Sequence, residues 1–274
     1  SKEIETNTFT DASFVLVENT TVALQQLAKY HREQFNIPVI GITGSNGKTI
    51  VKEWLFQLLT SEKNIVKSPK SYNSQVGVPL SVLNMEKENE LAIFEAGIST
   101  VGEMENLQKI IQPSIGILTN IGSAHDAGFS SAEEKIKEKL KLFEDCTAVI
   151  YSDKYLDSPE PIVHSARFIS FGDGETSTLI IKQKEKKKNS TIVEINSTAF
   201  NIHHSTFNIP FTDEASIENC LHCVVTLLYL GFSLEKIQTK ILSLRNLPMR
   251  LELKYGINNC TIIDDSYSAD FHSL

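Results

Sequence analysis

The feature that most constrains the fold is a glycine-rich loop between a short apolar run and an amphipathic segment. Residues 37–42 (IPVIGI) form a run typical of a buried strand. Residues 43–49 (TGSNGKT) follow directly, and apolar positions then occur at helical spacing from Ile50 to Leu59. A strand, a glycine loop and a helix in this order predict a phosphate-binding loop, because backbone N–H groups and the helix N-terminus converge on one anion.

The polar residues of this loop suit a nucleotide phosphate chain. Lys48 would place a positive charge at the β- and γ-phosphates, and the Thr49 hydroxyl would lie next to Mg²⁺. The glycines stand at positions 41, 44 and 47, and Ile42 occupies the place where ordinary GTPases and AAA-type ATPases carry glycine. The spacing therefore disfavours those classes, and a plain glycine turn is the alternative. The residues expected to bind the phosphates are Gly44, Ser45, Asn46, Gly47, Lys48 and Thr49.

Strand-like and helical patterns alternate through the first two thirds of the chain. Such alternation predicts βαβ units, and hence an α/β fold with a mostly parallel sheet and helices on both faces. A lead-in helix precedes them, with an N-cap at Asn19 or Thr20 and an apolar face formed by Val22, Leu24, Leu27, Ala28 and Tyr30. The predicted strands cover 91–94, 115–118, 147–151 and 167–171, and the helices between them cover 101–111 and 131–144.

A different pattern begins at Leu179. Period-two alternation over about 177–211 predicts a small antiparallel β subdomain, in which the lysine-rich run 184–190 is a solvated hairpin tip rather than a functional basic patch. The elements predicted after this insertion are helices at 214–231 and 233–244 and a strand at 261–265.

The composition excludes several functional classes. Lys and Arg total 26 and Asp and Glu total 34, so the formal net charge is −8 and the chain lacks the basic surface of a nucleic-acid-binding protein. The most apolar run, residues 221–232, is shorter than the about 20 residues that a membrane helix needs. Four cysteines are too few for a disulfide scaffold, so a cytoplasmic location is expected. Cys220 and Cys223 lie in an apolar helical stretch, which favours buried packing over metal or redox chemistry.

The order of several motifs resembles the Mur ligase family of ATP-dependent amide ligases. The spacing GxxGxNGKT at 41–49 is similar to the ATP loop of that family, and residues 119–125 (TNIGSAH) closely match its TNIGxAH motif. Residues 72–79 (YNSQVGVP) resemble the segment that lines its substrate cleft. Further similarities lie at Glu95-Ala96-Gly97, Phe171-Gly172, Asn219, Arg250-Leu251-Glu252 and Asp264-Asp265-Ser266-Tyr267.

The resemblance implies a reaction and a set of site residues. A carboxylate would attack the γ-phosphate of ATP, and an amine would then displace phosphate from the acyl phosphate, with Mg²⁺ as the cofactor. Thr49 and Glu95 would hold one Mg²⁺, and His125 and Lys139 would hold a second. The catalytic residues would be Lys48, Glu95, His125 and Lys139. The other implied contacts are Asn219 at adenine, Arg250 at phosphate and Asp265 at ribose, with Tyr72, Asn73 and Ser99 as weaker candidates for the substrate.

The resemblance to the family implies that the side-chain amine of Lys139 is carboxylated. A carbamate is an anionic oxygen ligand for a hard metal ion, whereas an ammonium is repelled by it. The position follows from aligning Phe143 with the end of the family's AKxEIF motif, and Lys135, Lys137 and Lys141 lie nearby. The alternatives are a solvated basic helix face for the lysines, an ordinary loop histidine for His125 and a surface ion pair for Arg250 and Asp265.

Within the family, the motifs are most similar to those of the ligases that add D-alanyl-D-alanine to a UDP-N-acetylmuramoyl-tripeptide, in cytoplasmic peptidoglycan precursor synthesis. Residues 211–219 (FTDEASIEN) and 268–270 (SAD) resemble the variant that is fused to an alanine racemase. The expected partners are therefore these two small-molecule substrates, with no nucleic acid and no membrane insertion. The alternatives are another amide ligase of the family, similar to MurE or folylpolyglutamate synthetase, and a nucleotide-binding module without ligase activity.

The resemblance also divides the chain into three parts. Residues 1–34 would be the end of an N-terminal domain, residues 35–247 the ATP-binding central domain, and residues 248–274 a linker toward a C-terminal ligase domain. Groups on several domains normally close around the substrates of such enzymes. We therefore expect the isolated chain to bind Mg-ATP weakly and to ligate nothing.

Overall fold

One large sheet forms the centre of the structure, a computed structural model that describes residues 13–122, 128–156, 163, 166–248, 252–264 and 266. In its described part the strand order is β2-β3-β1-β4-β5-β6-β7-β8-β9. Neighbours from β2 to β7 pair in parallel, whereas β7, β8 and β9 pair antiparallel. The strands are β1 (Val39–Thr43), β2 (Ile65–Lys67), β3 (Leu91–Glu95), β4 (Ile115–Leu118), β5 (Ala148–Ser152), β6 (Arg167–Gly172), β7 (Leu179–Lys186), β8 (Thr191–Ser197) and β9 (Ile202–Ile209).

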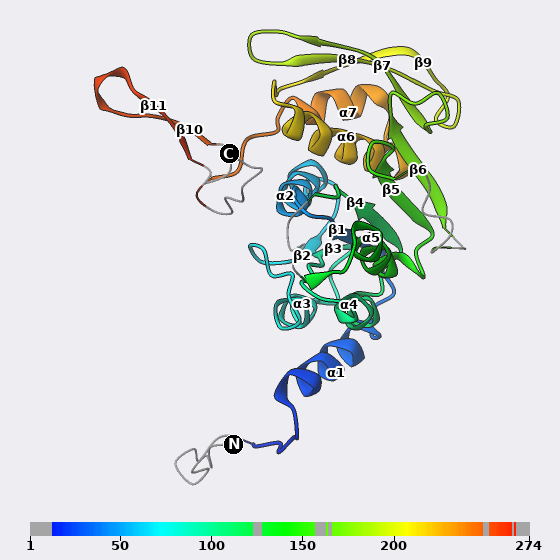
Figure 1. The fold of residues 1–274 in the computed structure, drawn as a ribbon, viewed down its shortest axis with the longest axis vertical. Helices are drawn as coiled ribbons and strands as arrows, with labels where there is room; N and C mark the ends of the chain where they lie inside the picture. The colour runs from blue at the N-terminus through cyan, green and yellow to red at the C-terminus, as the bar shows by residue number, and fades with distance from the viewer. Residues whose placement is uncertain are drawn as a thin grey trace.

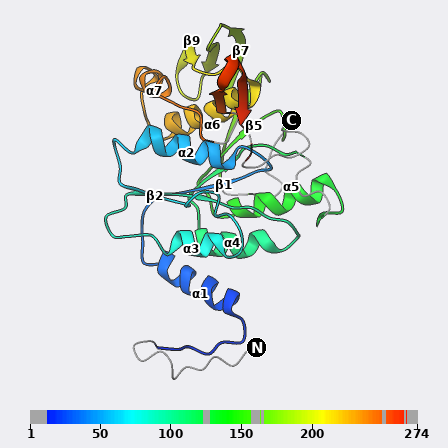
Figure 2. The same ribbon diagram turned by 90° about the vertical axis from the view of Figure 1, so that its left-hand side faces the viewer.

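Helices cover both faces of the parallel part of the sheet, which confirms the predicted α/β fold. Figure 2 shows α2 (Lys48–Leu59), α6 (Glu214–Tyr229) and α7 (Leu234–Ile241) on one side. The helices on the other side are α3 (Gly77–Val82), α4 (Glu103–Ile111) and α5 (Ala132–Leu140), with α1 (Thr20–Arg32) packed outside α3 and α4.

The strands at the centre carry continuous apolar runs because both of their faces are covered. Every residue of β1, β3, β4 and β5 is buried. Two hydrophobic clusters result, one on each face of the sheet: Trp54 and Phe171 belong to the cluster beneath α2 and α6, and Phe94 and Phe143 belong to the cluster beneath α4. The buried strand predicted from residues 37–42 is therefore confirmed as the central strand β1.

The antiparallel insertion extends the main sheet instead of forming a sheet of its own. β7 pairs in parallel with β6 and antiparallel with β8, and the three antiparallel strands lie beside α6 and α7 (Figure 1). At the tip, Lys187 N donates to Ser190 O at 2.8 Å, which closes the predicted hairpin. Lys184 and Lys186 both form ion pairs with Glu214 on the surface.

Three of the described α-helices and strands were not predicted. β2 has only three residues, and α3 has six, with Pro79 inside it, so neither carries a readable period. The third is β10 (Glu252–Tyr255), which pairs with β11 (Thr261–Asp264) in a separate two-stranded sheet. This hairpin stands apart from the main sheet (Figure 1).

Helix α1 begins where it was predicted and buries only part of its predicted apolar face. The Asn19 side chain accepts hydrogen bonds from two backbone N–H groups at 2.9 and 3.1 Å, which confirms it as the N-cap. Within the predicted apolar face, Ala28 is buried as expected, whereas Val22, Leu27 and Tyr30 are exposed. Arg32, which was not predicted to lie on that face, is buried. Arg32 is buried because its guanidinium donates to the carbonyl groups that end α4, at 2.9 and 3.1 Å.

The cysteine pair is packed inside α6, as predicted. Cys220, His222 and Cys223 are all fully buried. Burial raises the pKa of Cys220 to about 12, so this thiol stays protonated near neutral pH. Among the described helices, including α6, none has both the length and the apolar character required to cross a bilayer.

Trp54 offers a test of the packing between α2 and the segments that follow β9 and α7. Its side chain is 1% exposed, stacks on Phe211 at 4.6 Å and donates from Nε1 to Arg245 O at 2.9 Å. We predict that Trp54→Ala lowers the free energy of unfolding by about 3–5 kcal/mol, because it leaves a cavity and an unpaired carbonyl. Urea unfolding followed by circular dichroism measures this loss. Leu80→Ala, at an exposed position of α3, is the control and should change stability by about 0.5 kcal/mol or less; equal losses would contradict the prediction.

Candidate nucleotide-binding and metal-binding site

The site lies where three parallel strands end. β1 pairs with β3 on one side and β4 on the other, so the carboxyl ends of these strands meet at one edge of the sheet. The glycine loop follows β1, Glu95 ends β3, and residues 119–122 follow β4. β3 and β4 lie on opposite sides of β1, so this is a point where the strand order reverses, and open α/β sheets bind ligands at such points.

The glycine loop has a conformation that only glycine accommodates at two positions. Gly44 has φ +147° and Gly47 has φ +82°. A Cβ atom on Gly44 would lie 2.0 Å from Thr119 Oγ1, and one on Gly47 would lie 2.4 Å from Asn219 Oδ1. The loop is therefore held between residue 119 and α6, and Gly47 is the N-cap from which α2 starts at Lys48. A phosphate at this point would meet the positive end of the α2 dipole.

Residues 119–122 fix the loop through a set of hydrogen bonds. Asn120 accepts from Ser45 N through its backbone oxygen at 2.9 Å and from Asn46 N through Oδ1 at 2.7 Å. Thr119 Oγ1 donates to Asn46 O at 2.5 Å, and Ser45 Oγ accepts from Gly122 N at 2.9 Å. Sequence reasoning identified this segment as a motif but assigned no role to Thr119 or Asn120. The available signal was the motif itself, since a polar TN pair directly after a buried strand has to satisfy its hydrogen bonds locally.

His222 supports the same segment from beneath. Its Nε2 lies 2.9 Å from Thr119 O, and a carbonyl oxygen can only accept, so Nε2 carries the proton. Burial lowers the pKa of His222 to about 4, and the hydrogen bond to Thr119 opposes this shift only partly. The imidazole is therefore neutral near pH 7, and it links α6 to the support of the loop.

Lysine side chains converge on the loop from two helices. Lys48 Nζ donates to Gly44 O at 2.8 Å and to Ser45 O at 3.0 Å, and Lys139 Nζ of α5 donates to Gly44 O at 3.2 Å. Lys135, one turn before Lys139, donates to Gly122 O. Lys135 and Lys139 are both buried. Desolvation, reinforced by the positive charges of Lys48 and Lys135, lowers the pKa of Lys139 to about 7. Such a concentration of positive charge in an acidic protein suits a bound polyanion.

Oxygen groups that could hold a divalent cation lie beside the loop. Thr49 Oγ1 donates to Glu95 Oε2 at 3.0 Å, and Asn73 Nδ2 lies 3.5 Å from the same oxygen. Glu95 is fully buried, and Lys52 Nζ lies 2.9 Å from its other oxygen. A hydroxyl and a carboxylate are the hard oxygen ligands that Mg²⁺ takes alongside nucleotide phosphates and water, so these residues fit Mg²⁺. Within the described residues, no three His, Cys, Asp or Glu side chains form a self-contained metal cluster.

The structure brings most of the predicted site residues together and leaves others apart. One group of predicted residues lies around the glycine loop, namely residues 44–49, Glu95, Lys139 and Asn219. Asn73 contacts Glu95 of this group. Tyr72 is 43% exposed beside it, and Ser99 is an exposed residue whose N–H donates to Glu103 at 2.6 Å. Three predicted residues lie outside the described part of the chain: His125, Arg250 and Asp265.

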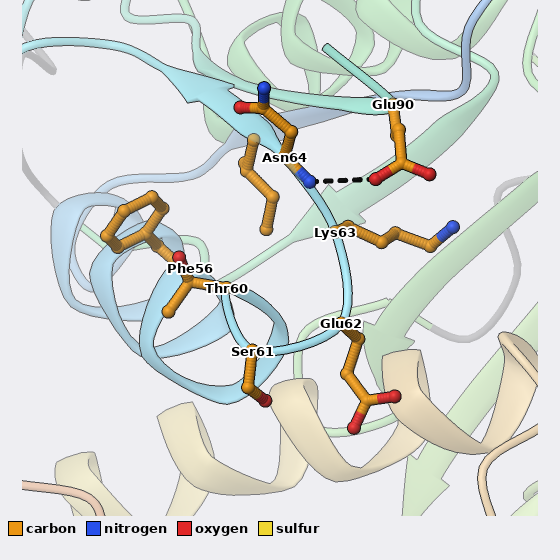
Figure 3. A pocket seen from close by; sticks show the side chains of 8 residues that line it. Phe56, Thr60, Ser61, Glu62, Lys63, Asn64 and Glu90 are labelled. Carbon is orange, nitrogen blue, oxygen red and sulfur yellow. Dashed lines mark hydrogen bonds between the residues drawn. The ribbon is translucent and has the colours of Figure 1, made fainter. Parts of the chain in front are cut away.

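A surface pocket lies at the other end of α2 and is separate from this site. Figure 3 shows the pocket, which is lined by residues 60–65 together with Phe56 and Glu90. Asn64 N donates to Glu90 Oε2 at 2.9 Å on its wall. At 1.5 Å per residue, the length of α2 separates this pocket from the loop by about 18 Å. It is formed at the amino ends of β2 and β3, where no loop residue reaches.

Comparison with known protein families and proteins shows which ones this chain is similar to. The family description "Mur ligase middle domain" matches residues 42–227. The UDP-N-acetylmuramoyl-tripeptide–D-alanyl-D-alanine ligase of Bacillus subtilis is 29% identical over 267 residues, which cover 95% of this chain and 56% of that protein. The ligase of the same name from Buchnera aphidicola subsp. Baizongia pistaciae is 31% identical over 265 residues, covering 95% and 57%.

Solved structures give the same result. A crystal structure of MurF from Acinetobacter baumannii has a TM-score of 0.83 at 28% identity, with 95% of this chain and 58% of that chain covered. MurF from Thermotoga maritima in complex with ADP has a TM-score of 0.80 at 25% identity, with 100% and 62% covered. The chain thus spans less than two thirds of the length of the relatives that it matches.

Asn120 provides a test of the loop geometry. We predict that Asn120→Ala weakens the binding of Mg-ADP about 2- to 12-fold, since it removes the acceptor of Asn46 N–H, and one net hydrogen bond contributes about 0.5–1.5 kcal/mol. Isothermal titration calorimetry measures the affinity. Asn89→Ala is the control, because Asn89 caps a surface turn by accepting from Glu86 N at 2.7 Å. An affinity for Asn120→Ala equal to that of the control would show that the loop keeps its shape without this side chain.

Proposed function

The chain belongs to the Mur ligase family, whose middle domain it carries, and we propose that it is the ATP-binding part of an enzyme that joins D-alanyl-D-alanine to a UDP-N-acetylmuramoyl-tripeptide. The observation that supports this most is the convergence of the glycine loop, the Thr49–Glu95 pair and buried lysines at one edge of the sheet. The substrates are taken from the names of relatives that match 95% of the chain.

In the proposed reaction, a carboxylate of the tripeptide attacks the γ-phosphorus of ATP, and the bond to the bridging oxygen breaks to release ADP. The amine of D-alanyl-D-alanine then attacks the acyl carbon, loses a proton and displaces inorganic phosphate. The first step brings two anions together, so it needs fixed positive charge at the transferred phosphoryl group. Lys48, which already lies against the loop carbonyls, supplies that charge once phosphate replaces them as its partner.

Thr49 and Glu95 would hold the Mg²⁺ of the nucleotide, and that ion would neutralise charge on the phosphate oxygens. Asn73 Nδ2 lies 3.5 Å from the same Glu95 oxygen that accepts from Thr49. Asn219, which packs against Gly47, is proposed to contact the adenine. We assign Arg250 to phosphate, Asp265 to ribose, and Tyr72, Asn73 and Ser99 to the muramyl-peptide side.

We further propose that Lys139 is carboxylated in the active enzyme. Its neutral amine would attack CO₂, forming an N–C bond and releasing one proton, and the cation would become an anionic oxygen ligand. Burial and the neighbouring lysines support this chemistry, because a pKa lowered to about 7 leaves a large share of the amine neutral at pH 7–8. The carbamate and His125 would then hold a second Mg²⁺.

The proposed enzyme acts in cytoplasmic peptidoglycan precursor synthesis. The expectation that the gene continues into an alanine racemase stays a prediction, which sequencing downstream of the codon for Leu274 tests. A ligase of the same family with a different amine substrate is the main alternative. Offering D-alanyl-D-alanine, diaminopimelate, lysine and glutamate in parallel to the full-length protein distinguishes these activities.

The proposed function is tested by following ADP release and amide formation in the full-length protein that contains this chain. Amide product should require both UDP-muramyl tripeptide and D-alanyl-D-alanine, and the isolated 274-residue chain should form none.

We predict that Lys48→Ala lowers the turnover of the full-length enzyme at least ~10²-fold, the scale of losing one preorganised charge-stabilising group. Lys63→Ala, in the separate surface pocket, should keep the wild-type rate. Normal turnover of Lys48→Ala would mean that the loop does not hold the reacting phosphate.

The carbamate is tested by Lys139→Ala. We predict that this variant loses most of the activity and that a short carboxylate such as formate restores part of it, by occupying the vacated ligand position. Lys137→Ala is the matched control on the same helix, because Lys137 is exposed while Lys139 is buried. Dependence on bicarbonate in CO₂-free buffer gives an independent readout. A dead Lys137→Ala beside an active Lys139→Ala would mean that the wrong lysine was assigned.

A further inference from the structure

Lys52 is a fully buried lysine that the sequence did not mark as a site residue. It lies on α2, one turn after Lys48, and its side chain is 0% exposed. Its Nζ lies 2.9 Å from Glu95 Oε1 and 3.2 Å from Glu53 Oε1. It also donates to Ser68 O at 2.8 Å and to Lys70 O. The ammonium is thus enclosed by two carboxylates and two backbone carbonyls.

Packing alone does not explain a buried ammonium at this position. Removing a charge from water costs several kcal/mol, and an apolar side chain of similar volume often stabilises a protein at least as well. The neighbouring apolar residues of α2, such as Val51 and Leu55, show that the helix buries hydrocarbon at adjacent positions. The charge at Lys52 is therefore explained by the groups that it contacts, above all Glu95.

The contact with Lys52 divides the two oxygens of Glu95 between two partners. Oε1 faces Lys52, and Oε2 accepts from Thr49 Oγ1 at 3.0 Å. Glu95 is itself fully buried, so the side chains that contact it decide where its two oxygens lie. Lys52 fixes Oε1 and thereby leaves Oε2 directed toward Thr49, at the start of α2.

The same ammonium holds the segment that follows β2. Lys70 has φ +48°, a left-handed conformation that is uncommon for a residue with a side chain, and its carbonyl accepts from Lys52. Ser68 Oγ accepts from Glu95 N at 3.1 Å, and Gly97 N donates to Asn73 O at 2.8 Å. Residues 68–73 are thereby tied to the end of β3 on both sides of Glu95.

We propose that Lys52 is a positioning residue for the metal–nucleotide site. It keeps the Glu95 carboxylate oriented toward Thr49, and it fixes residues 68–73 against that carboxylate. The inference rests on the proposed function in one respect, namely that Glu95 holds the divalent cation that accompanies the nucleotide. It assigns to Lys52 no contact with substrate or nucleotide.

The test is the Mg²⁺ dependence of nucleotide binding by the 274-residue chain, with fluorescent N-methylanthraniloyl-ADP as the probe. Lys52→Met should raise the Mg²⁺ concentration for half-maximal binding about 10- to 100-fold, the usual effect of losing a partner of a metal ligand. The affinity for the probe in EDTA should stay as in the wild type. Lys67→Met is the matched control, because Lys67 contacts Glu53 in the same charged group at 2.6 Å but does not contact Glu95. An unchanged Mg²⁺ midpoint in a folded Lys52→Met protein overturns the proposal.

A double-variant comparison keeps the proposal falsifiable if Lys52→Met does not fold. Glu95→Gln and Lys52→Met/Glu95→Gln should have the same Mg²⁺ response, since Lys52 acts through Glu95, and the neutral pair leaves no uncompensated charge at Glu95. A further loss in the double variant would show an independent structural role and overturn the inference. If wild type and Glu95→Gln respond alike to Mg²⁺, the metal assignment in the proposed function fails as well. If they differ while Lys52→Met matches the wild type, only the inference about Lys52 fails.

Discussion

The parallel pairing of β1 with β3 and β4 is the constraint on which the rest of the site depends. Parallel strands present their carboxyl ends at one edge, so groups from three distant parts of the chain meet there without long loops. The glycine loop is held by residues 119–122, and Glu95 reaches the start of α2 through Thr49. A slip of one residue in either pairing would move these contacts out of reach.

The distribution of charge around α2 separates two tasks. At its N-terminus, Lys48 joins Lys135 and Lys139 from α5 around loop carbonyls, where positive charge is in excess and the pKa of Lys139 falls to about 7. One turn further, Lys52 is balanced by Glu95 and Glu53. The first arrangement suits a polyanion and the second suits a fixed carboxylate, and both lie within one helical turn in a protein whose net charge is −8.

Much of the fold was predictable because its signals are local. The apolar run at 37–42, the helical spacing after the glycine loop and the cap at Asn19 all act over a few residues, and each is confirmed. β2 and α3 were missed because they are too short to show a period. The packed face of α1 was only partly predicted: Ala28 is buried as expected, but Arg32, an ordinarily exposed residue, is buried as well because it donates to the carbonyls that end α4.

The sequence by itself determined the glycine loop between a buried strand and a helix and the alternation that produces a parallel sheet, and it indicated Lys48, Thr49 and Glu95 as candidate site residues. These depend on backbone freedom, periodicity and side-chain chemistry, which are readable along the chain. Only the tertiary structure decided that Asn120 and His222 support the loop and that the ammonium of Lys52 lies against Glu95. Those roles arise between residues that are 43 to 103 positions apart. They depend on strand order and burial, which no local pattern contains.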